Sequence, residues 1–446
     1  MSFMRLLLPL LLLFAGGCAI KPPPLTPANR MCAFVSYDLR VARPPDLRDA
    51  ASDRRTLGDV LDETVFRGGL ADATAPSESM LFLSGGSLNG AFGAGFLDQW
   101  KRLTTQQHLP DFKVVTGIST GSILATFAFL DQPERAVEGY TIDKESDLLT
   151  VPPGGVKNGD PTIAAYVQLL NKGALSDLGP LRGRLRGFFD DATLRKVAAE
   201  GARGRKLLIG VVDVDTGQAV VLDLTEMAAQ YVAASDDLTR QLKRDCYVEG
   251  VLASSSAPLA AVPVFIDNRM YIDGGARFGM FSDEIGDRIE RLADSSAKPT
   301  IYLLINGDQE IDPRCGKAED TNCNRPGGLS AGNTTGGHAS WTFTDLALRS
   351  EKILTNQVYR FSASSIKASA EQRHMGFHAI QIEQDMPGHL FDGKACKDWR
   401  VQDRQDGDPL QFYPKYMRCL IDYGRFHAGT VVPTWTAPDD GGAFGP

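Results

Sequence analysis

Strand-like apolar runs alternate with helix-like segments along the middle of the chain, and this alternation limits the possible folds more than any other feature. The runs occupy positions 80–85, 112–117, 206–215, 219–224 and 300–307. Such alternation is typical of a mostly parallel sheet with helices on both faces. The sequence therefore predicts an α/β fold, and 446 residues are enough for one large domain or two.

The first run leads into a glycine-rich loop with five glycines between Gly85 and Gly95. Such a cluster indicates a sharp bend or a close approach of the backbone to a ligand, commonly a phosphate or the oxyanion of acyl transfer. A nucleotide loop is disfavoured, because no Lys-Ser or Lys-Thr follows and the G-x-G-x-x-G spacing is reversed at Gly90, Gly93 and Gly95. A net charge of −8 also argues against a nucleic-acid partner.

The second run ends in a G-x-S-x-G sequence formed by residues 117–121, with a helix-like stretch after it. This is the context of a nucleophile elbow, in which Gly117 and Gly121 avoid collisions around the exposed Ser119. The N-terminus of the following helix favours developing negative charge. The motif alone is weak, since glycine and serine are common in this chain, and its position between strand and helix strengthens it.

A serine nucleophile needs a base, and Asp273 in an Asp-Gly-Gly sequence is the candidate. It ends a predicted short strand at 269–273, and the carboxyl ends of strands gather catalytic groups in open α/β sheets. On its own, Asp-Gly-Gly predicts only a turn. A Ser–Asp–His triad is also compatible with the order of the residues, because five histidines follow Asp273: His338, His374, His378, His389 and His427.

Taken together and in this order, "SGGSLNGAFGAG", "GISTG" and "DGG" resemble the patatin-like phospholipase family. The block at 253–275, with Pro258 and Pro263, is similar to that family as well, and the resemblance covers roughly residues 80–280. It implies a three-layer α/β/α fold and a Ser–Asp dyad without histidine, with Ser119 as nucleophile and Asp273 as general base.

The resemblance also implies a role for the glycine-rich loop. The backbone N–H groups of Gly85, Gly86 and Ser87 would form the oxyanion hole. The chain departs from the family at Asn89, where Arg or Lys is usual. Backbone donors survive this change, but electrostatic help toward a phosphorylated headgroup is in doubt.

The expected function is that of a serine lipid acyl hydrolase: a phospholipase A, lysophospholipase or esterase that acts through an acyl-enzyme without a cofactor or metal. The substrate would be a phospholipid or another acyl ester. Two alternatives stay open, namely acyl transfer by the same dyad and a non-catalytic lipid-binding envelope lipoprotein. Ile118 and the apolar residues at 127–129 are expected to build core and not an acyl pocket.

The N-terminal residues predict export. Residues 1–18 combine Arg5, an apolar run too short to span a bilayer and a lipobox-like Ala-Gly-Gly-Cys, so Cys18 is the expected lipidation site. A Pro-rich tether follows, as expected for a membrane-anchored protein of the cell envelope. Cleavage by ordinary signal peptidase, which would leave a soluble secreted or periplasmic protein, is the alternative.

Six cysteines remain after Cys18, an even number that predicts up to three disulfides in an oxidising compartment. Cys315 with Cys323 would close a short loop, Cys396 with Cys419 is a second plausible pair, and Cys32 with Cys246 follows by elimination. A zinc site is disfavoured, because the chain has no C-x-x-C pair.

The remaining segments complete the expected organisation. A tether and extension at 19–79, with a short helix near 56–66, precede a catalytic domain at 80–310. A disulfide loop and a helical C-terminal part at 311–432, with a long helix over 343–370, are expected to pack on the same domain. A disordered tail is expected at 433–446. Residues 175–204 predict a basic amphipathic helical segment with its apolar face toward the core.

Overall fold

The computed structural model describes residues 32–38, 77–157, 160–281, 300–307, 343–372, 375–383, 386 and 388–436. The predicted signal segment with Cys18, the tether, the short helix near 56–66 and the Cys315–Cys323 loop lie outside the described residues, so those expectations stay predictions.

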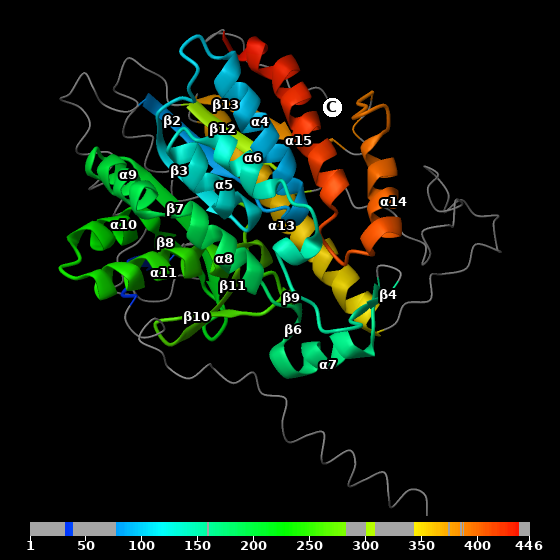
Figure 1. Ribbon diagram of the computed structural model, residues 1–446. Helices are drawn as coiled ribbons and strands as arrows, with labels where there is room; N and C mark the ends of the chain where they lie inside the picture. Colours follow the sequence, from blue (N-terminus) through cyan, green and yellow to red (C-terminus); the bar gives the residue numbers. More distant parts are fainter. Residues whose placement is uncertain are drawn as a thin grey trace, which may run out of the picture.

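A nine-stranded sheet forms the centre of the described structure (Figure 1). Its main strand order is β1-β8-β7-β3-β2-β12-β13, and β11 joins β7 and carries β10. The five strands from β7 to β13 are parallel, whereas β1, β8, β10 and β11 pair antiparallel. The strands are β1 Ser36–Asp38, β2 Ser77–Leu83, β3 Phe112–Ile118, β7 Lys206–Asp213, β8 Ala219–Asp223, β10 Val264–Ile266, β11 Arg269–Asp273, β12 Thr300–Ile305 and β13 Gly376–Gln381.

Every strand predicted from the apolar runs is present, and the mostly parallel α/β fold is confirmed. β13 was not predicted, and it extends the sheet beside β12 with residues from the C-terminal part of the chain. Two small sheets lie apart from the central one: β4 Val156–Lys157 with β5 Asp160–Pro161, and β6 Ala174–Ser176 with β9 Leu259–Ala261.

Side chains of the central strands alternate between two hydrophobic cores, because successive residues of a strand point to opposite faces. Leu81 and Leu83 of β2 enter one core, and Met80 and Phe82 enter the other. Figure 1 shows α13 behind the sheet and most other helices in front of it. The helices are α4 Gly90–Leu103, α5 Thr120–Phe129, α6 Pro133–Tyr140, α7 Ile163–Lys172, α8 Gly179–Phe188, α9 Asp191–Ala202, α10 Leu224–Ala233, α11 Asp237–Ser254, α13 Phe343–Gln372, α14 Cys396–Gly407 and α15 Pro414–Val431.

The predicted long helix near 343–370 is α13, and the amphipathic segment at 175–204 forms α8 and α9. Aspartate side chains accept hydrogen bonds from backbone N–H groups at the starts of α9, α10 and α11, which satisfies donors that a helix start leaves free. The residues responsible are Asp190, Asp223 and Asp236.

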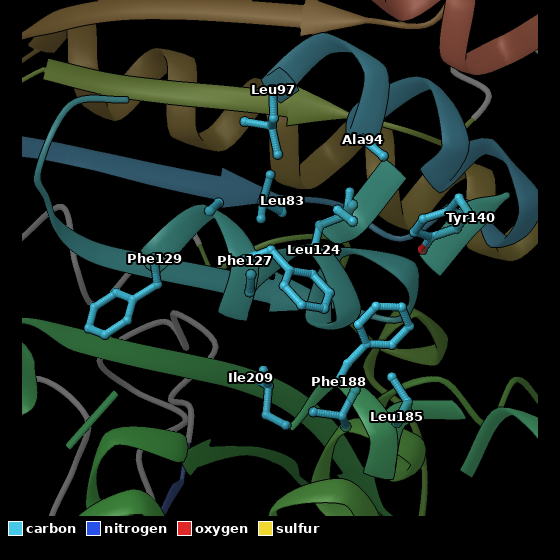
Figure 2. Packing of buried hydrophobic residues seen from close by; sticks show 14 of the residues in the cluster. Leu83, Ala94, Leu97, Leu124, Phe127, Phe129, Tyr140, Leu185, Phe188 and Ile209 are labelled. Carbon is cyan, nitrogen blue, oxygen red and sulfur yellow. The ribbon is translucent and has the colours of Figure 1, made fainter. Parts of the chain in front are cut away.

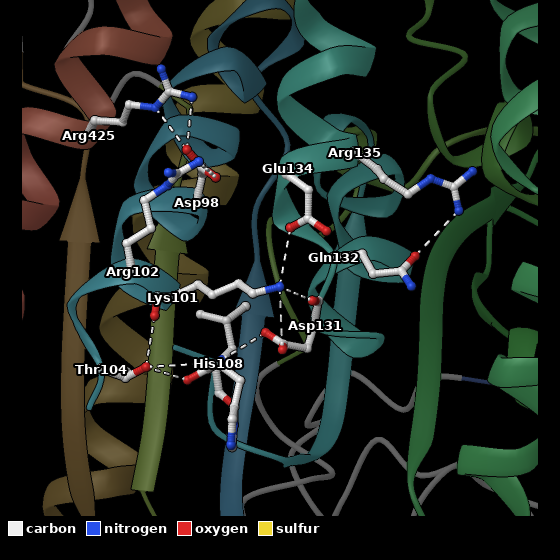
Figure 3. Close-up of polar contacts among 11 residues, drawn as sticks. Asp98, Lys101, Arg102, Thr104, His108, Asp131, Gln132, Glu134, Arg135 and Arg425 are labelled. Atoms are coloured by element: carbon white, nitrogen blue, oxygen red, sulfur yellow. Dashed lines mark hydrogen bonds and ion pairs between the residues drawn. The ribbon is translucent and has the colours of Figure 1, made fainter. Parts of the chain in front are cut away.

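Helix α15 packs along α4, and a buried carboxylate joins them (Figure 3). Asp98 of α4 is 2% exposed and accepts hydrogen bonds from Arg425 of α15 at 2.9 Å and from Arg102 at 3.1 Å. A buried carboxylate needs such partners, because desolvation of an unpaired charge is costly. The C-terminal helix is therefore fixed to the helix that follows the glycine-rich loop.

Two predicted disulfides are present, Cys32–Cys246 and Cys396–Cys419. His389 lies beside the second pair, whose sulfurs are bonded to each other. The expected disordered tail begins inside a 3-10 helix, η7 Val432–Thr436, so its first four residues, 433–436, are ordered contrary to expectation. Among the described helices, none combines the length and apolar character needed to cross a bilayer.

Candidate active site

Ser119 lies at the turn between β3 and α5, at the carboxyl end of a central parallel strand. Its backbone has φ 55° and ψ −128°, a conformation that non-glycine residues rarely adopt. A Cβ at Gly117 would collide with the carbonyl oxygen of Gly121, and one at Gly121 would collide with that of Leu83. Both glycines of the predicted elbow are therefore required by packing.

Serines at the C-terminal end of α11 hold the backbone of this turn. Ser254 Oγ accepts the Ser119 N–H at 3.0 Å and donates to the Gly210 carbonyl at 2.7 Å. Ser255 Oγ donates to the Ser119 carbonyl at 3.2 Å. Both serines belong to the block at 253–275, but no local pattern around them indicated this role.

Asp273 is 4% exposed and hydrogen-bonds the Ser119 side chain, so the structure brings the two predicted residues together. Its Oδ1 also accepts the Gly275 N–H at 2.7 Å, and its own N–H donates to the Ser256 carbonyl at 3.0 Å. The predicted strand before it is β11, but this strand runs antiparallel to β7. Asp273 thus reaches Ser119 from the opposite direction to the one expected for parallel strand ends.

Burial raises the pKa of Asp273 to about 7, although hydrogen bonds from Ser119 and Gly275 act in the other direction. A carboxylate whose pKa lies near 7 is a much stronger proton acceptor than one with an ordinary pKa. Tyr359 of α13 lies close to the Asp273 carboxylate: a Cβ at Gly275 would be 2.7 Å from the Tyr359 hydroxyl and 3.1 Å from Asp273 Oδ1. Burial, reinforced by the charge of Asp273, raises the pKa of Tyr359 well above its ordinary value, so its hydroxyl stays protonated.

The glycine-rich loop lies beside Ser119, since a Cβ at Gly85 would be 2.9 Å from the Ser119 Cβ. Gly86 has φ 149°, which only glycine adopts readily, and Ser87 has φ 54° at the start of η3 Ser87–Asn89. Among the described residues, no acceptor is found for the backbone N–H groups of Gly86 and Ser87. Such free donors beside a nucleophile can receive an oxyanion.

Asn306, which directly follows β12, holds the start of the glycine-rich loop by hydrogen bonds to Ser84. The Asn306 N–H donates to Ser84 Oγ at 2.9 Å, and its side-chain amide donates to the Ser84 carbonyl at 3.0 Å. Asn89, where the family usually has a basic residue, is the last residue of η3 and precedes α4.

An apolar pocket of about 750 Å³, open mouth included, begins at Ser119 and lies between α5 and α8. Ile118, Phe127 and Phe129 lie in the hydrophobic core as expected, and Phe127 lines the pocket as well. Figure 2 shows Phe127 facing Phe188, with ring centroids 5.6 Å apart. Other apolar lining residues are Ile123, Leu148, Leu178, Leu181, Leu185 and Phe412.

The C-terminal part of the chain also reaches this pocket. Gln411 and Phe412, in the segment between α14 and α15, line it together with Ser87 and Ser119. Neither residue was predicted to have a function, because nothing in the local sequence pattern around them indicates a site.

Histidine does not join the described site. His378 stacks on Tyr302, His389 lies 3.2 Å from Asp422, and His427 lies 3.9 Å from Glu383. His338 and His374 lie outside the described residues. Within the described part of the chain, therefore, Ser119 and Asp273 pair without a histidine.

The site combines a serine on a strained strand–helix turn with a buried carboxylate that is hydrogen-bonded to it and with an adjacent apolar pocket. On an α/β fold, this combination is typical of a serine hydrolase. Residues 81–281 match the family described as patatin-like phospholipase. The predicted resemblance is therefore confirmed for residues 81–281, which form a patatin-like phospholipase domain of a lipid hydrolase family. A search of curated proteins found no match.

Proposed function

We propose that this protein hydrolyses acyl esters of lipids through a covalent acyl-enzyme on Ser119. One observation carries the proposal: the Ser119 hydroxyl is hydrogen-bonded to the buried Asp273 carboxylate at the mouth of an apolar pocket. The family match supports a lipid substrate, and the pocket supports an acyl chain.

In the first step, Asp273 accepts the Ser119 proton while Oγ forms a bond to the ester carbonyl carbon. The carbonyl oxygen becomes negatively charged and receives hydrogen bonds from the N–H groups of Gly85, Gly86 and Ser87. When the intermediate collapses, the ester C–O bond breaks and Asp273 returns the proton to the leaving alcohol. Ser119 then carries the acyl group.

In the second step, Asp273 accepts a proton from a water molecule whose oxygen attacks the acyl carbonyl. The bond to Ser119 Oγ breaks, the proton returns to Oγ, and a carboxylic acid leaves. An alcohol in place of water would give acyl transfer instead. The residues of the dyad serve both reactions, so the product must be measured.

The chemistry of the pocket favours one fatty acyl chain as its occupant. Phe127, Leu181, Leu185 and Phe188 give the wall an apolar surface. Arg184 also contributes to the wall, but its guanidinium donates to the carbonyls of Glu138 and Thr141 at 2.8 and 2.9 Å. The positive group is thus held by backbone carbonyls of the protein.

Release of fatty acid from p-nitrophenyl acyl esters and from lysophospholipid vesicles tests this proposal. We expect Ser119→Ala and Asp273→Asn to lower kcat by at least about 10³-fold, as loss of a catalytic residue typically does. Ser235→Ala, at an exposed serine, is the matched control and should retain full activity. Equal activity of Ser119→Ala and the wild type would overturn the proposal. If an alcohol is added and its acyl ester is the main product, the reaction is acyl transfer and not hydrolysis.

A further inference from the structure

A segment at residues 408–413 joins α14 to α15 and contributes to the pocket beside the dyad. It lies outside residues 81–281, which match the family. The Cys396–Cys419 disulfide connects the two helices and encloses this segment in its loop. The segment is thus a part of the site that the family match does not cover.

Glu145 fixes the backbone of this segment. The Glu145 carboxylate accepts three consecutive backbone N–H groups, those of Leu410, Gln411 and Phe412, at 2.9, 2.6 and 2.8 Å. Hydrogen bonds to an ionised acceptor are stronger than those between neutral groups. This carboxylate therefore holds three residues of the segment in one conformation.

Helix α15 adds two further attachments. Arg418 donates to the Ile142 carbonyl at 3.2 Å and to Asp143 at 2.7 Å, both close to Glu145 in the chain. Arg425, farther along α15, pairs with the buried Asp98 of α4. The segment is anchored on both sides, so its side chains have defined positions relative to the glycine-rich loop.

Gln411 uses this position to bind the loop itself. Its side-chain amide donates a hydrogen bond of 2.7 Å to Ser87 Oγ, across 324 residues of sequence. Ser87 has φ 54° and bears one of the backbone N–H groups assigned to the oxyanion. A bond to its side chain restricts the rotation of this residue and, with it, the direction of the N–H group.

We infer that Gln411 is a positioning residue for the oxyanion hole and acts through Ser87. This inference rests on the proposed function. The interaction acts on the transition state, in which the N–H group meets a full negative charge, more than on the bound ester. Loss of Gln411 should therefore lower kcat and leave KM nearly unchanged.

A double-mutant cycle of Gln411→Leu and Ser87→Ala tests the inference in the full-length protein. Each variant removes one side of the bond, and alanine retains the backbone N–H group of residue 87. We expect each single variant to lose about tenfold in kcat, and the double variant to lose about tenfold as well, because one interaction is removed in all three. Gln402→Ala is the matched control, since this glutamine of α14 bonds only the exposed Asp406 among the described residues.

Amide hydrogen exchange of the peptide that contains residues 85–88 gives a second readout, which does not require activity. We expect faster exchange in Gln411→Leu than in the wild type, and no change in Gln402→Ala. Independent, multiplicative losses of kcat or unchanged exchange in Gln411→Leu would overturn the inference. A wild-type protein without hydrolysis would refute the proposed function alone, and the exchange result would then decide the role of Gln411.

Discussion

At the residue scale, Asp273 combines burial with hydrogen bonds from Ser119 and Gly275. Burial disfavours the charged form, and the pKa of Asp273 rises to about 7 because the hydrogen bonds offset only part of this effect. The same burial that strengthens the base also makes its ionised form costly to the fold.

The pH dependence of acylation follows from this pKa. Asp273 accepts a proton only when it is ionised, so the rate should rise with pH through about 7 and reach a plateau above it. Stopped-flow measurement of the p-nitrophenol burst between pH 5 and 9 checks this expectation. A rate independent of pH across 6–8 would contradict the role of Asp273 as base.

The stability of the wild type should depend on pH in the opposite sense to the acylation rate, and Asp273→Asn should remove this dependence. The folded-state pKa of about 7 lies above the unfolded value of about 3.9, so the stability contributed by this group falls as pH rises from about 4 to 7. Asparagine removes this loss. We therefore expect the Tm of the variant relative to the wild type to be higher at pH 8 than at pH 5, measured by thermal denaturation. An equal difference at both pH values would argue against a buried ionised aspartate.

At the scale of elements, the pocket depends on two helices with different parts in the site. α5 follows the nucleophile and supplies Ile123 and Phe127, whereas α8 belongs to a segment whose pattern predicted only an amphipathic, core-facing helix. The apolar face of α8 is both core and pocket wall, and sequence periodicity does not distinguish these uses.

Phe188→Leu should shift substrate preference toward longer acyl chains. The smaller side chain enlarges the pocket where Phe188 meets Phe127. The measurement is kcat/KM for a series of p-nitrophenyl esters of increasing chain length. Phe129→Leu is the control, because Phe129 is also aromatic and buried but does not line the pocket. An identical preference in both variants would show that the acyl chain does not lie between α5 and α8.

The two disulfides of the described residues should have different effects when removed. Cys32–Cys246 spans 214 residues and Cys396–Cys419 only 23, so the first constrains the unfolded chain more. Cys396 and Cys419 enclose the segment that carries Gln411. We expect their replacement by serine to lower kcat more than Tm, and replacement of Cys32 and Cys246 to lower Tm more than kcat. The reverse order would contradict a role of the C-terminal segment in the site.

At the scale of the whole molecule, local sequence patterns were sufficient for the α/β class, the elbow at Ser119 and the strand that ends at Asp273. They missed β13 and the direction of β11, because strand pairing is decided by distant partners. They also missed Gln411, whose partner Ser87 is 324 residues away. No local sequence pattern predicts this contact, because it forms when α15 packs on α4 in the folded chain.

The predicted lipid anchor concerns the whole molecule as well. Cys18→Ser should move the protein from the membrane fraction to the soluble fraction of the cells that produce it, because lipidation requires the thiol. Fractionation with radiolabelled palmitate incorporation measures both effects. The comparison is the Ala15→Ser variant, which keeps Cys18 intact. We expect far less of this variant than of Cys18→Ser in the soluble fraction. Unlabelled wild-type protein in the soluble fraction would instead support cleavage by ordinary signal peptidase.

The proposed reaction depends above all on Ser119 being an activated nucleophile. The most direct measurement is to treat the purified protein with a fluorophosphonate and locate the adduct by peptide mass spectrometry. We expect one adduct on Ser119, which is lost in Ser119→Ala and strongly reduced in Asp273→Asn. An adduct on another residue, or none on folded wild-type protein, would contradict it.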